Sequence, residues 1–165
     1  MTVGIVNALV EVPLESLLEV GLVALSTKIY TIGVVVDRGV PVGVLLPGYD
    51  EQQLARSGLR ELFDNDFVVP LRGGHDATGR ESEPLDEAGA EDAILRLRSK
   101  VSAFAISGMF GVRNPAHERR LRERVAELSD RPVTCGHELA SSLDAPRRAL
   151  TVALNARMVP IIHEL

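Results

Sequence analysis

Short uncharged, mostly apolar segments alternate with amphipathic ones along most of this chain. Segment 41–46 closes at the turn Pro47-Gly48 and segment 101–107 ends in Ser107, and such short apolar segments are typical of strands buried on both faces of a parallel sheet. Further strands of this kind are expected at 21–27, 67–71 and 132–135. Apolar residues at helical spacing separate these segments. The pattern therefore predicts an α/β protein with a mainly parallel sheet and flanking helices.

Helix patterns fall between the predicted strands. Four helices are expected, at 4–20 with a break at Pro13, at 90–99, from 114 to about 128, and from Asp144 or Pro146 onward. Asn114 is expected to cap the third helix, with Pro115 in its first turn. The inward residues of that helix would be Leu121, Val125 and Leu128. Pro160 should end or kink the last helix, and 72–89 is expected to be a loop.

Length and composition suit one domain over residues 1–165. Of the 165 residues, 45% are hydrophobic and 25% are charged, enough for a single core. The formal net charge is -5 and aromatic residues make up only 4%. Because nucleic-acid binding needs basic surface and stacking platforms, we expect no nucleic-acid partner.

Cys135 is the single cysteine, so no internal disulfide can form and a reducing, cytoplasmic setting is expected. We expect its thiol to behave as a small buried hydrophobic group. Residues 101–112 are the longest uncharged stretch, too short to cross a bilayer, so no membrane partner is expected. Residues 1–15 lack the basic start of a signal peptide.

Polar segments follow several predicted strands. Ligands of open parallel sheets bind beyond the carboxyl ends of the strands, where Ser26 and Thr27, segment 72–78 and segment 107–114 would meet. Adjacent glycines such as Gly73-Gly74 permit positive φ and close backbone approach, and successive N–H groups can hold an anion. A flexible surface turn explains two adjacent glycines equally well.

Each histidine precedes an acid, in the pairs His75-Asp76, His117-Glu118, His137-Glu138 and His163-Glu164. Neighbouring side chains on a helix or strand diverge, so no pair can chelate a metal by itself, and a metal site is the less favoured interpretation. Glu118 in a first helical turn would suit the helix dipole. His163 is expected to be exposed and inert.

Charged and polar residues also occur in regular patterns on the last two predicted helices. Arginines and glutamates interleave on the first of them, at Arg119, Arg120, Arg122 and Arg124 with Glu118, Glu123 and Glu127. A solvated face with i,i+4 ion pairs is the simplest interpretation. Arg148, Thr151 and Asn155 form one stripe on the final helix. This stripe can be the solvent face, but Thr and Asn are poor helix formers, which leaves a role in a site open.

Taken together, these residues resemble the amino-terminal region of the hydantoinase A/5-oxoprolinase family. The resemblance runs from Leu25 to about Ile162. It is carried by Gly73-Gly74-His75-Asp76 with Gly79, Pro84-Leu85-Asp86, Arg113-Asn114-Pro115 with His117-Glu118, and Arg148, Thr151, Asn155-Ala156 and Pro160. It implies an actin-like (ribonuclease H-like) ATPase fold, here incomplete. It also implies opening of cyclic amides of the hydantoin or 5-oxoproline type with ATP and Mg or another divalent metal, and partner subunits.

The resemblance, with the strand-end pattern, places a substrate or nucleotide cleft on eleven residues. They are Thr27, Gly73, Gly74, His75, Asp76, Asn114, His117, Glu118, Arg148, Thr151 and Asn155. It assigns neither catalytic residues nor metal ligands among them.

Two parts of the family pattern are missing. No Asp-x-Gly-Gly-Thr phosphate loop occurs in 1–20, and Lys28 and Ile32 replace a Thr and an Asn of the family's Thr-Thr-x-x-Thr-Asn segment. One hypothesis is therefore a piece of an ATP-dependent cyclic-amide hydrolase, inactive alone and completed by the rest of the enzyme or a second subunit. The other is a non-catalytic relative that binds a small metabolite or a partner subunit. Exposed apolar surface would favour a homo-oligomer under both.

Overall fold

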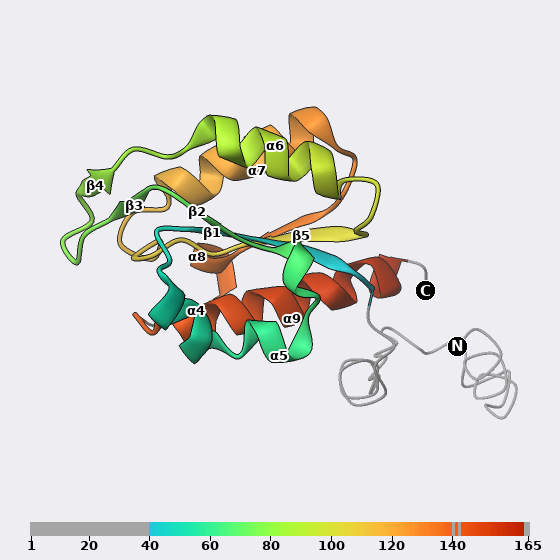
Figure 1. The fold of residues 1–165 in the computed structure, drawn as a ribbon, viewed down its shortest axis with the longest axis horizontal. Helices are drawn as coiled ribbons and strands as arrows, with labels where there is room; N and C mark the ends of the chain where they lie inside the picture. The colour runs from blue at the N-terminus through green and yellow to red at the C-terminus, as the bar shows by residue number, and fades with distance from the viewer. Residues whose placement is uncertain (1–39, 140, 142, 164–165) are drawn as a thin grey trace, which may run out of the picture.

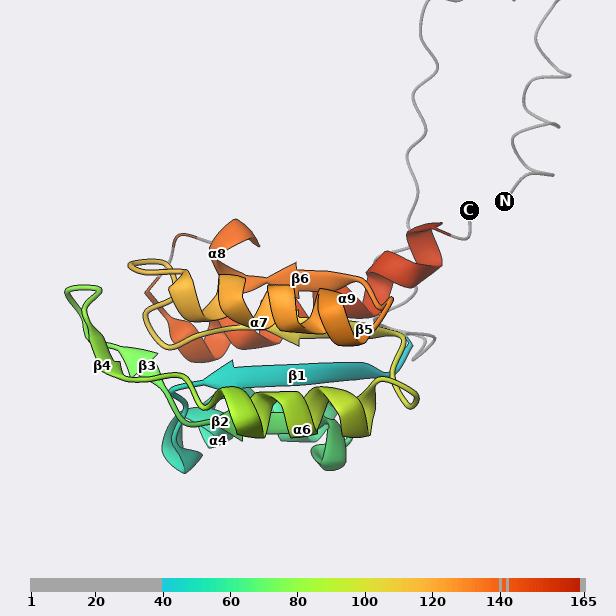
Figure 2. The same ribbon diagram turned by 90° about the horizontal axis from the view of Figure 1, so that it is seen from above.

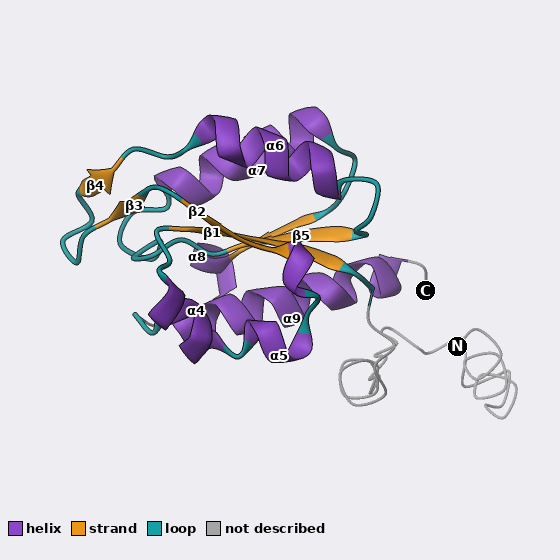
Figure 3. Cartoon of the chain, in the orientation of Figure 1, coloured by secondary structure: helices purple, strands orange, loops and turns teal. Residues whose placement is uncertain are grey.

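A computed structural model of the chain describes residues 40–139, 141 and 143–163. Its centre is a four-stranded parallel sheet in the order β2-β1-β5-β6 (Figures 1 and 3). The strands are β1 (Val42–Pro47), β2 (Val68–Leu71), β5 (Ala103–Ile106) and β6 (Val133–Cys135). An antiparallel hairpin of β3 (Gly74–His75) and β4 (Glu81–Glu83) projects beyond the carboxyl end of β1, as Figure 2 shows.

Helices cover both faces of this sheet. They are α4 (Glu51–Ser57), α5 (Leu59–Leu62), the 3-10 helix η1 (Asn65–Phe67), α6 (Glu87–Leu97), α7 (Ala116–Leu128), α8 (Gly136–Leu139) and α9 (Ala145–His163). Helices α6 and α7 lie on one face, and α4, α5 and α9 lie on the other (Figure 1). In the described part of the chain, no helix is long and apolar enough to cross a membrane.

Strand β1 is buried on both faces, which is why it consists of apolar residues. Val42, Val44 and Leu46 point into the core on the α9 side, whereas Leu45 points into the core on the α6 side. Because both faces are buried, no position of β1 can be polar without a partner. A Cβ at Gly43 would lie 2.8 Å from the Phe104 ring on the neighbouring strand β5, so the strand needs a glycine there.

Four predicted strands are confirmed: 41–46, 67–71, 101–107 and 132–135 match β1, β2, β5 and β6. The predicted helix 4–20 and strand 21–27 lie outside the described residues. The expectation of a loop over 72–89 was too simple, because this segment holds the β3–β4 hairpin and the start of α6. That helix begins at Glu87 because the Asp86 carboxylate accepts the N–H of Gly89. Short helices α4, α5 and α8 were not predicted, since too few residues carry their apolar pattern.

Two helix-end predictions need correction. Pro115, not Asn114, is the N-cap of α7. Asn114 instead joins two segments, because its Oδ1 accepts the Ala116 N–H and its Nδ2 donates to the Gly79 carbonyl. Pro160 does not end α9, which continues to His163. A proline lacks only its own N–H, so one hydrogen bond is lost and the helix can continue past it, while the kink stays a prediction.

The predicted inward residues of α7 are confirmed in part. Leu121 and Val125 are fully buried, while Leu128 is partly buried at the core margin. The predicted position of Glu118 on a solvated face was wrong, because this residue is 0% exposed. The ion pairs are not at i,i+4 spacing either. Arg120 and Arg124 pair at i,i+3 and also reach acids on α6, because the two helices lie side by side.

Replacing Phe104 with alanine should lower the free energy of unfolding by about 3–5 kcal/mol, because the ring is fully buried between β5 and the α6–α7 layer. Urea unfolding followed by circular dichroism measures the loss. The control Leu95→Ala, at a residue 39% exposed on α6, should cost less than about 1 kcal/mol. Equal losses in the two variants would contradict this core.

Candidate functional site

A cavity of about 410 Å³ opens at the carboxyl ends of β1 and β2. Its wall is formed by Gly48, Tyr49, Asp50, Pro70, Leu71, Arg72, Gly73, Gly74, His75, Ser82, Glu83 and Met109. The chain leaves β1 toward α4 on one face of the sheet and leaves β2 toward α6 on the other. Adjacent strands whose connections depart to opposite faces leave a crevice at this edge, which is where open α/β sheets bind ligands.

Glycine backbones form part of the cavity wall. Gly48, Gly73 and Gly74 have φ of +82°, +127° and +145°, values that residues with a Cβ rarely adopt. A Cβ at Gly48 would lie 2.8 Å from the Gly73 carbonyl oxygen. The close backbone approach predicted for Gly73-Gly74 is therefore confirmed.

Two histidines meet at the edge of the cavity. His75 on β3 lines the cavity and is 5% exposed, and its ring lies 4.3 Å from that of His117 in the first turn of α7. His117 Nε2 donates to Glu81 Oε1 on β4 at 2.8 Å, and β4 pairs with β3 in a register that sets Glu81 opposite His75. Burial lowers the pKa of His75, with the His117 charge as the second cause. The His75 ring is therefore neutral at neutral pH.

Asp76, the other polar residue of this segment, shapes the hairpin turn instead of the cavity. Its Oδ1 accepts hydrogen bonds from the Thr78 N–H, the Thr78 hydroxyl and the Arg80 N–H. The Thr78 hydroxyl is the main reason that the pKa of Asp76 is lowered. This turn holds the β3–β4 hairpin against the Asn114 side chain through Gly79.

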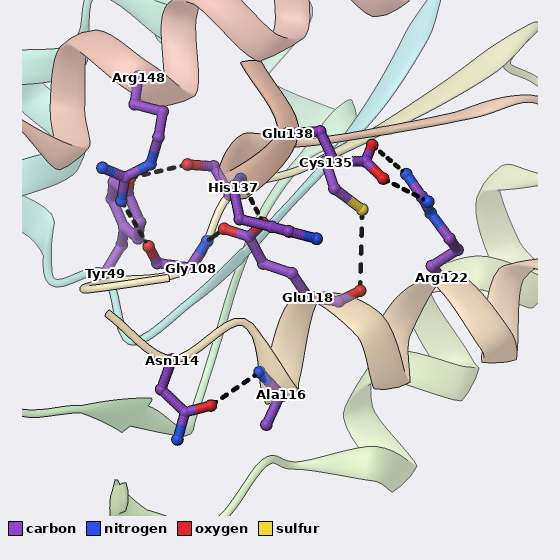
Figure 4. A network of polar contacts seen from close by, with 11 residues as sticks. Tyr49, Gly108, Asn114, Ala116, Glu118, Arg122, Cys135, His137, Glu138 and Arg148 are labelled. Atoms are coloured by element: carbon purple, nitrogen blue, oxygen red, sulfur yellow. Dashed lines mark hydrogen bonds and ion pairs between the residues drawn. The ribbon is translucent and has the colours of Figure 1, made fainter. Parts of the chain in front are cut away.

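Beside the cavity lies a buried network centred on Glu118, shown in Figure 4. Glu118 Oε1 accepts the Gly108 N–H at 2.8 Å. Its Oε2 accepts the His137 N–H at 2.8 Å and lies 2.6 Å from His137 Nδ1. The carboxylate thus joins the loop after β5 to the start of α8 after β6. We refer to Glu118, Gly108 and His137 as the Glu118 network.

A glycine leaves room for this network, and a buried arginine is hydrogen-bonded to it. A Cβ at Gly111 would lie 2.2 Å from Glu118 Oε1, so no side chain fits there. Arg148, 2% exposed on α9, donates from Nη2 to the Gly108 carbonyl at 2.8 Å. Tyr49 OH donates to the Ala145 carbonyl at 2.7 Å, and burial raises the pKa of Tyr49 to about 12. The amino-terminal end of α9 is therefore fixed to the loops after β1 and β5.

One group of three metal-ligand side chains occurs among the described residues. The ligand atoms of Glu118, Cys135 and His137 lie within 4.8 Å of one another. The group does not suit Mg²⁺, which requires oxygen ligands, because it offers one carboxylate whose oxygens already accept hydrogen bonds. The other two ligand atoms are also engaged, because the Cys135 thiol donates to the Glu118 carbonyl and His137 Nδ1 is bound to Glu118 Oε2. The group is therefore a hydrogen-bonded cluster, and the described residues do not form a fitted metal site.

The predicted cleft residues divide into three sets. Gly73, Gly74 and His75 line the cavity, His117 contacts His75, and Asn114 and Asp76 hold the adjacent hairpin. Glu118 belongs to the buried Glu118 network, and Arg148 donates to the Gly108 carbonyl of that network. The predicted position of Arg148 on a solvent face was therefore wrong. Thr151 and Asn155 donate to carbonyls of their own helix, at Arg147 and Thr151, and are not brought to the cavity. Thr27 lies outside the described residues.

Sequence reasoning missed Tyr49 and His137. Both residues directly follow the end of a strand pattern, Tyr49 after Pro47-Gly48 and His137 after Cys135 and Gly136. The rule that ligands bind beyond the carboxyl ends of strands could have selected both. The expectation that Cys135 is a buried hydrophobic group is confirmed by its exposure of 0%.

Comparison with known proteins decides the family. The sequence profile of the hydantoinase/oxoprolinase N-terminal region matches residues 1–129. The chain belongs to the hydantoinase/oxoprolinase family. It is 31% identical over 175 residues to the caprolactamase subunit alpha of Pseudomonas jessenii, a match that covers 96% of this chain and 25% of that protein. It is 30% identical over 105 residues to the acetophenone carboxylase gamma subunit of Aromatoleum aromaticum, covering 58% and 14%.

Solved structures share the fold of this chain. The ATP-dependent caprolactamase of Pseudomonas jessenii superposes with a TM-score of 0.82 at 29% identity, covering 97% of this chain and 26% of that chain. The nucleotide-free acetone carboxylase superposes with a TM-score of 0.68 at 20% identity, covering 82% and 23%. The predicted mainly parallel α/β architecture is confirmed, and these likenesses are consistent with the actin-like ATPase type. The chain spans a quarter or less of the length of the curated relatives it matches.

Glu118→Gln should lower the free energy of unfolding by roughly 2–4 kcal/mol, because an amide group would face buried N–H donors of Gly108 or His137. Thermal and urea unfolding measure the change. Glu123→Gln, at an exposed acid of the same helix, is the matched control and should change stability by less than about 0.5 kcal/mol. A Glu118→Gln variant as stable as the control would show that the network does not hold these loops together.

Cys135 should react with a thiol reagent only when the protein unfolds. A pKa of about 12 leaves roughly one thiol in ten thousand ionised at pH 8, and the side chain is fully buried. Ellman's reagent gives the rate directly, since this is the single cysteine. Labelling in denaturing urea is the control, and equally fast labelling of the native chain would contradict the buried position.

Proposed function

We propose that this chain is part of an ATP-dependent enzyme that opens cyclic amides, and that it is not active alone. The observation that carries the proposal is the match to ATP-dependent caprolactamase over 97% of this chain, with a TM-score of 0.82. The name of that relative includes a cyclic amide and ATP, and the present chain spans 26% of its length. The rest of the enzyme or a second subunit would complete the site.

The cavity supports a small cyclic amide as ligand. Its 410 Å³ falls in the range of small-molecule sites, about 300–1,000 Å³. Leu71 and Met109 offer apolar contact to a ring, while Arg72 and His75 offer donor and acceptor groups to an amide edge. These residues would bind and orient the ring. Lactam, hydantoin and 5-oxoproline rings all present such an edge.

ATP would reach the amide carbonyl from residues outside this cavity. Activation of the carbonyl oxygen by phosphoryl transfer is the chemistry that ATP supplies to such a reaction. The described residues do not form a Mg²⁺ site, and the nucleotide and its metal would be held by groups outside this described part, whether in this chain or in the remainder of the enzyme. A reducing cytoplasmic compartment agrees with the buried single thiol.

A second candidate function is a non-catalytic relative that binds a small metabolite or a partner subunit. It is favoured by Lys28 and Ile32, which replace a hydroxyl and an amide of the family pattern. Joined to the missing part of the enzyme, such a chain would bind the ring without supporting ATP-dependent hydrolysis. Hydrolysis by the assembled enzyme, followed by phosphate release, would exclude it.

Lactams should bind to the chain in this cavity. Titration of six- and seven-membered lactams into ¹⁵N-labelled protein should shift backbone signals of residues 71–75 and 82–83. Ser82→Phe, which fills the cavity, should weaken binding at least about tenfold. Ser99→Phe is the matched control, because Ser99 is exposed far from the cavity wall and its variant should bind normally. Absence of binding to the native chain, or equal binding by both variants, would contradict the proposal.

A further inference from the structure

His75 presents an unsatisfied polar ring to the cavity. The side chain is 5% exposed and belongs to the cavity wall. Among the described residues, no hydrogen bond involves its ring nitrogens, and neither nitrogen is one of the fully buried unpaired atoms, so both are reachable from the cavity. An imidazole without a protein partner at a cavity wall is suited to a ligand that supplies the missing hydrogen bond.

His117 and Glu81 hold this ring in place. His117 packs on His75 with 4.3 Å between ring centroids, and its Nε2 is bound to Glu81. His117 Nδ1 is buried and has no partner among the described residues. The contact fixes the His75 ring from behind, so that its free nitrogens remain available to the cavity. His117 is thus a positioning residue.

Charged groups from each surrounding segment act on the His75 ring. His117 on α7 disfavours a second positive charge, while Glu81 on β4 and Asp76 after β3 favour one. Arg72, Asp50 and Glu83 complete the charged wall of the cavity. Burial outweighs the two carboxylates, so the pKa of His75 stays below its ordinary value of 6.5.

We propose that the unpaired imidazole of His75 accepts a hydrogen bond from the ring N–H of the cyclic amide, and so selects rings whose nitrogen is unsubstituted. The inference rests on the proposed function. A neutral imidazole always has one nitrogen that accepts, whereas the Arg72 guanidinium can only donate and suits the amide carbonyl. The side chains of Asp50, Ser82 and Glu83 in the wall are exposed to water, and the Tyr49 hydroxyl is bound to the Ala145 carbonyl. His75 is then the buried acceptor left for the N–H.

Three probes test this selection: a six-membered lactam, its N-methyl derivative and a C-methyl derivative of equal size. The native chain should bind the first and third alike and the N-methyl lactam about tenfold more weakly, because the acceptor loses its only partner. In His75→Leu this ratio should fall to about one. Nuclear magnetic resonance titration gives all the affinities, and the dispersed spectrum of the variant confirms that it is folded.

The pH dependence supplies a readout that packing alone would not produce. The preference for the N–H lactam should persist from pH 8 to below 6.5 and disappear as the pH falls through the lowered pKa of His75, because a protonated ring cannot accept. Equal binding of the lactam and its N-methyl derivative by the native chain would overturn this inference but leave the proposed function standing. Failure of every lactam to bind would overturn both.

Discussion

The buried carboxylate of Glu118 and its hydrogen bonds are the interaction on which the carboxyl-end edge of the sheet depends. The carboxylate is fully buried, and it accepts hydrogen bonds from backbone groups that belong to the loops after β5 and β6. Burial of a carboxylate is unfavourable unless such donors surround it, so its position and theirs determine each other. Met109, which follows Gly108, forms part of the cavity wall. The shape of the cavity is therefore linked to the network.

The edge of the sheet thus has two chemically distinct halves. Around Glu118, donors and acceptors satisfy one another and Arg148 closes the network from α9. Around His75, the cavity is open and the imidazole has no protein partner among the described residues. A satisfied polar cluster makes its surroundings rigid, whereas an unsatisfied group beside a cavity remains available for a ligand. Such a division suits a family whose members act on amides or ketones.

The four histidine-acid pairs show how far sequence reasoning can go. Adjacent side chains do diverge as predicted, because none of His75, His117 and His137 is hydrogen-bonded to the acid that follows it. The interleaved arginines and glutamates of α7 led to the wrong place for Glu118, which was assigned to a solvated face. His137 instead binds Glu118, and His117 binds Glu81. Those partners lie 19 and 36 residues away, and no local pattern predicts which of them meet.

By itself, the sequence determined the parallel sheet, the glycines at positive φ and the buried cysteine. Continuous apolar runs leave a strand no exposed face, and a missing Cβ is the condition for the Gly48–Gly73 contact. Only the tertiary structure decided that Arg148 is buried, that Thr151 and Asn155 bond to their own helix, and that His75 faces a cavity. The physical reason is that a parallel sheet brings the ends of distant strands to one edge, where packing selects which polar groups meet.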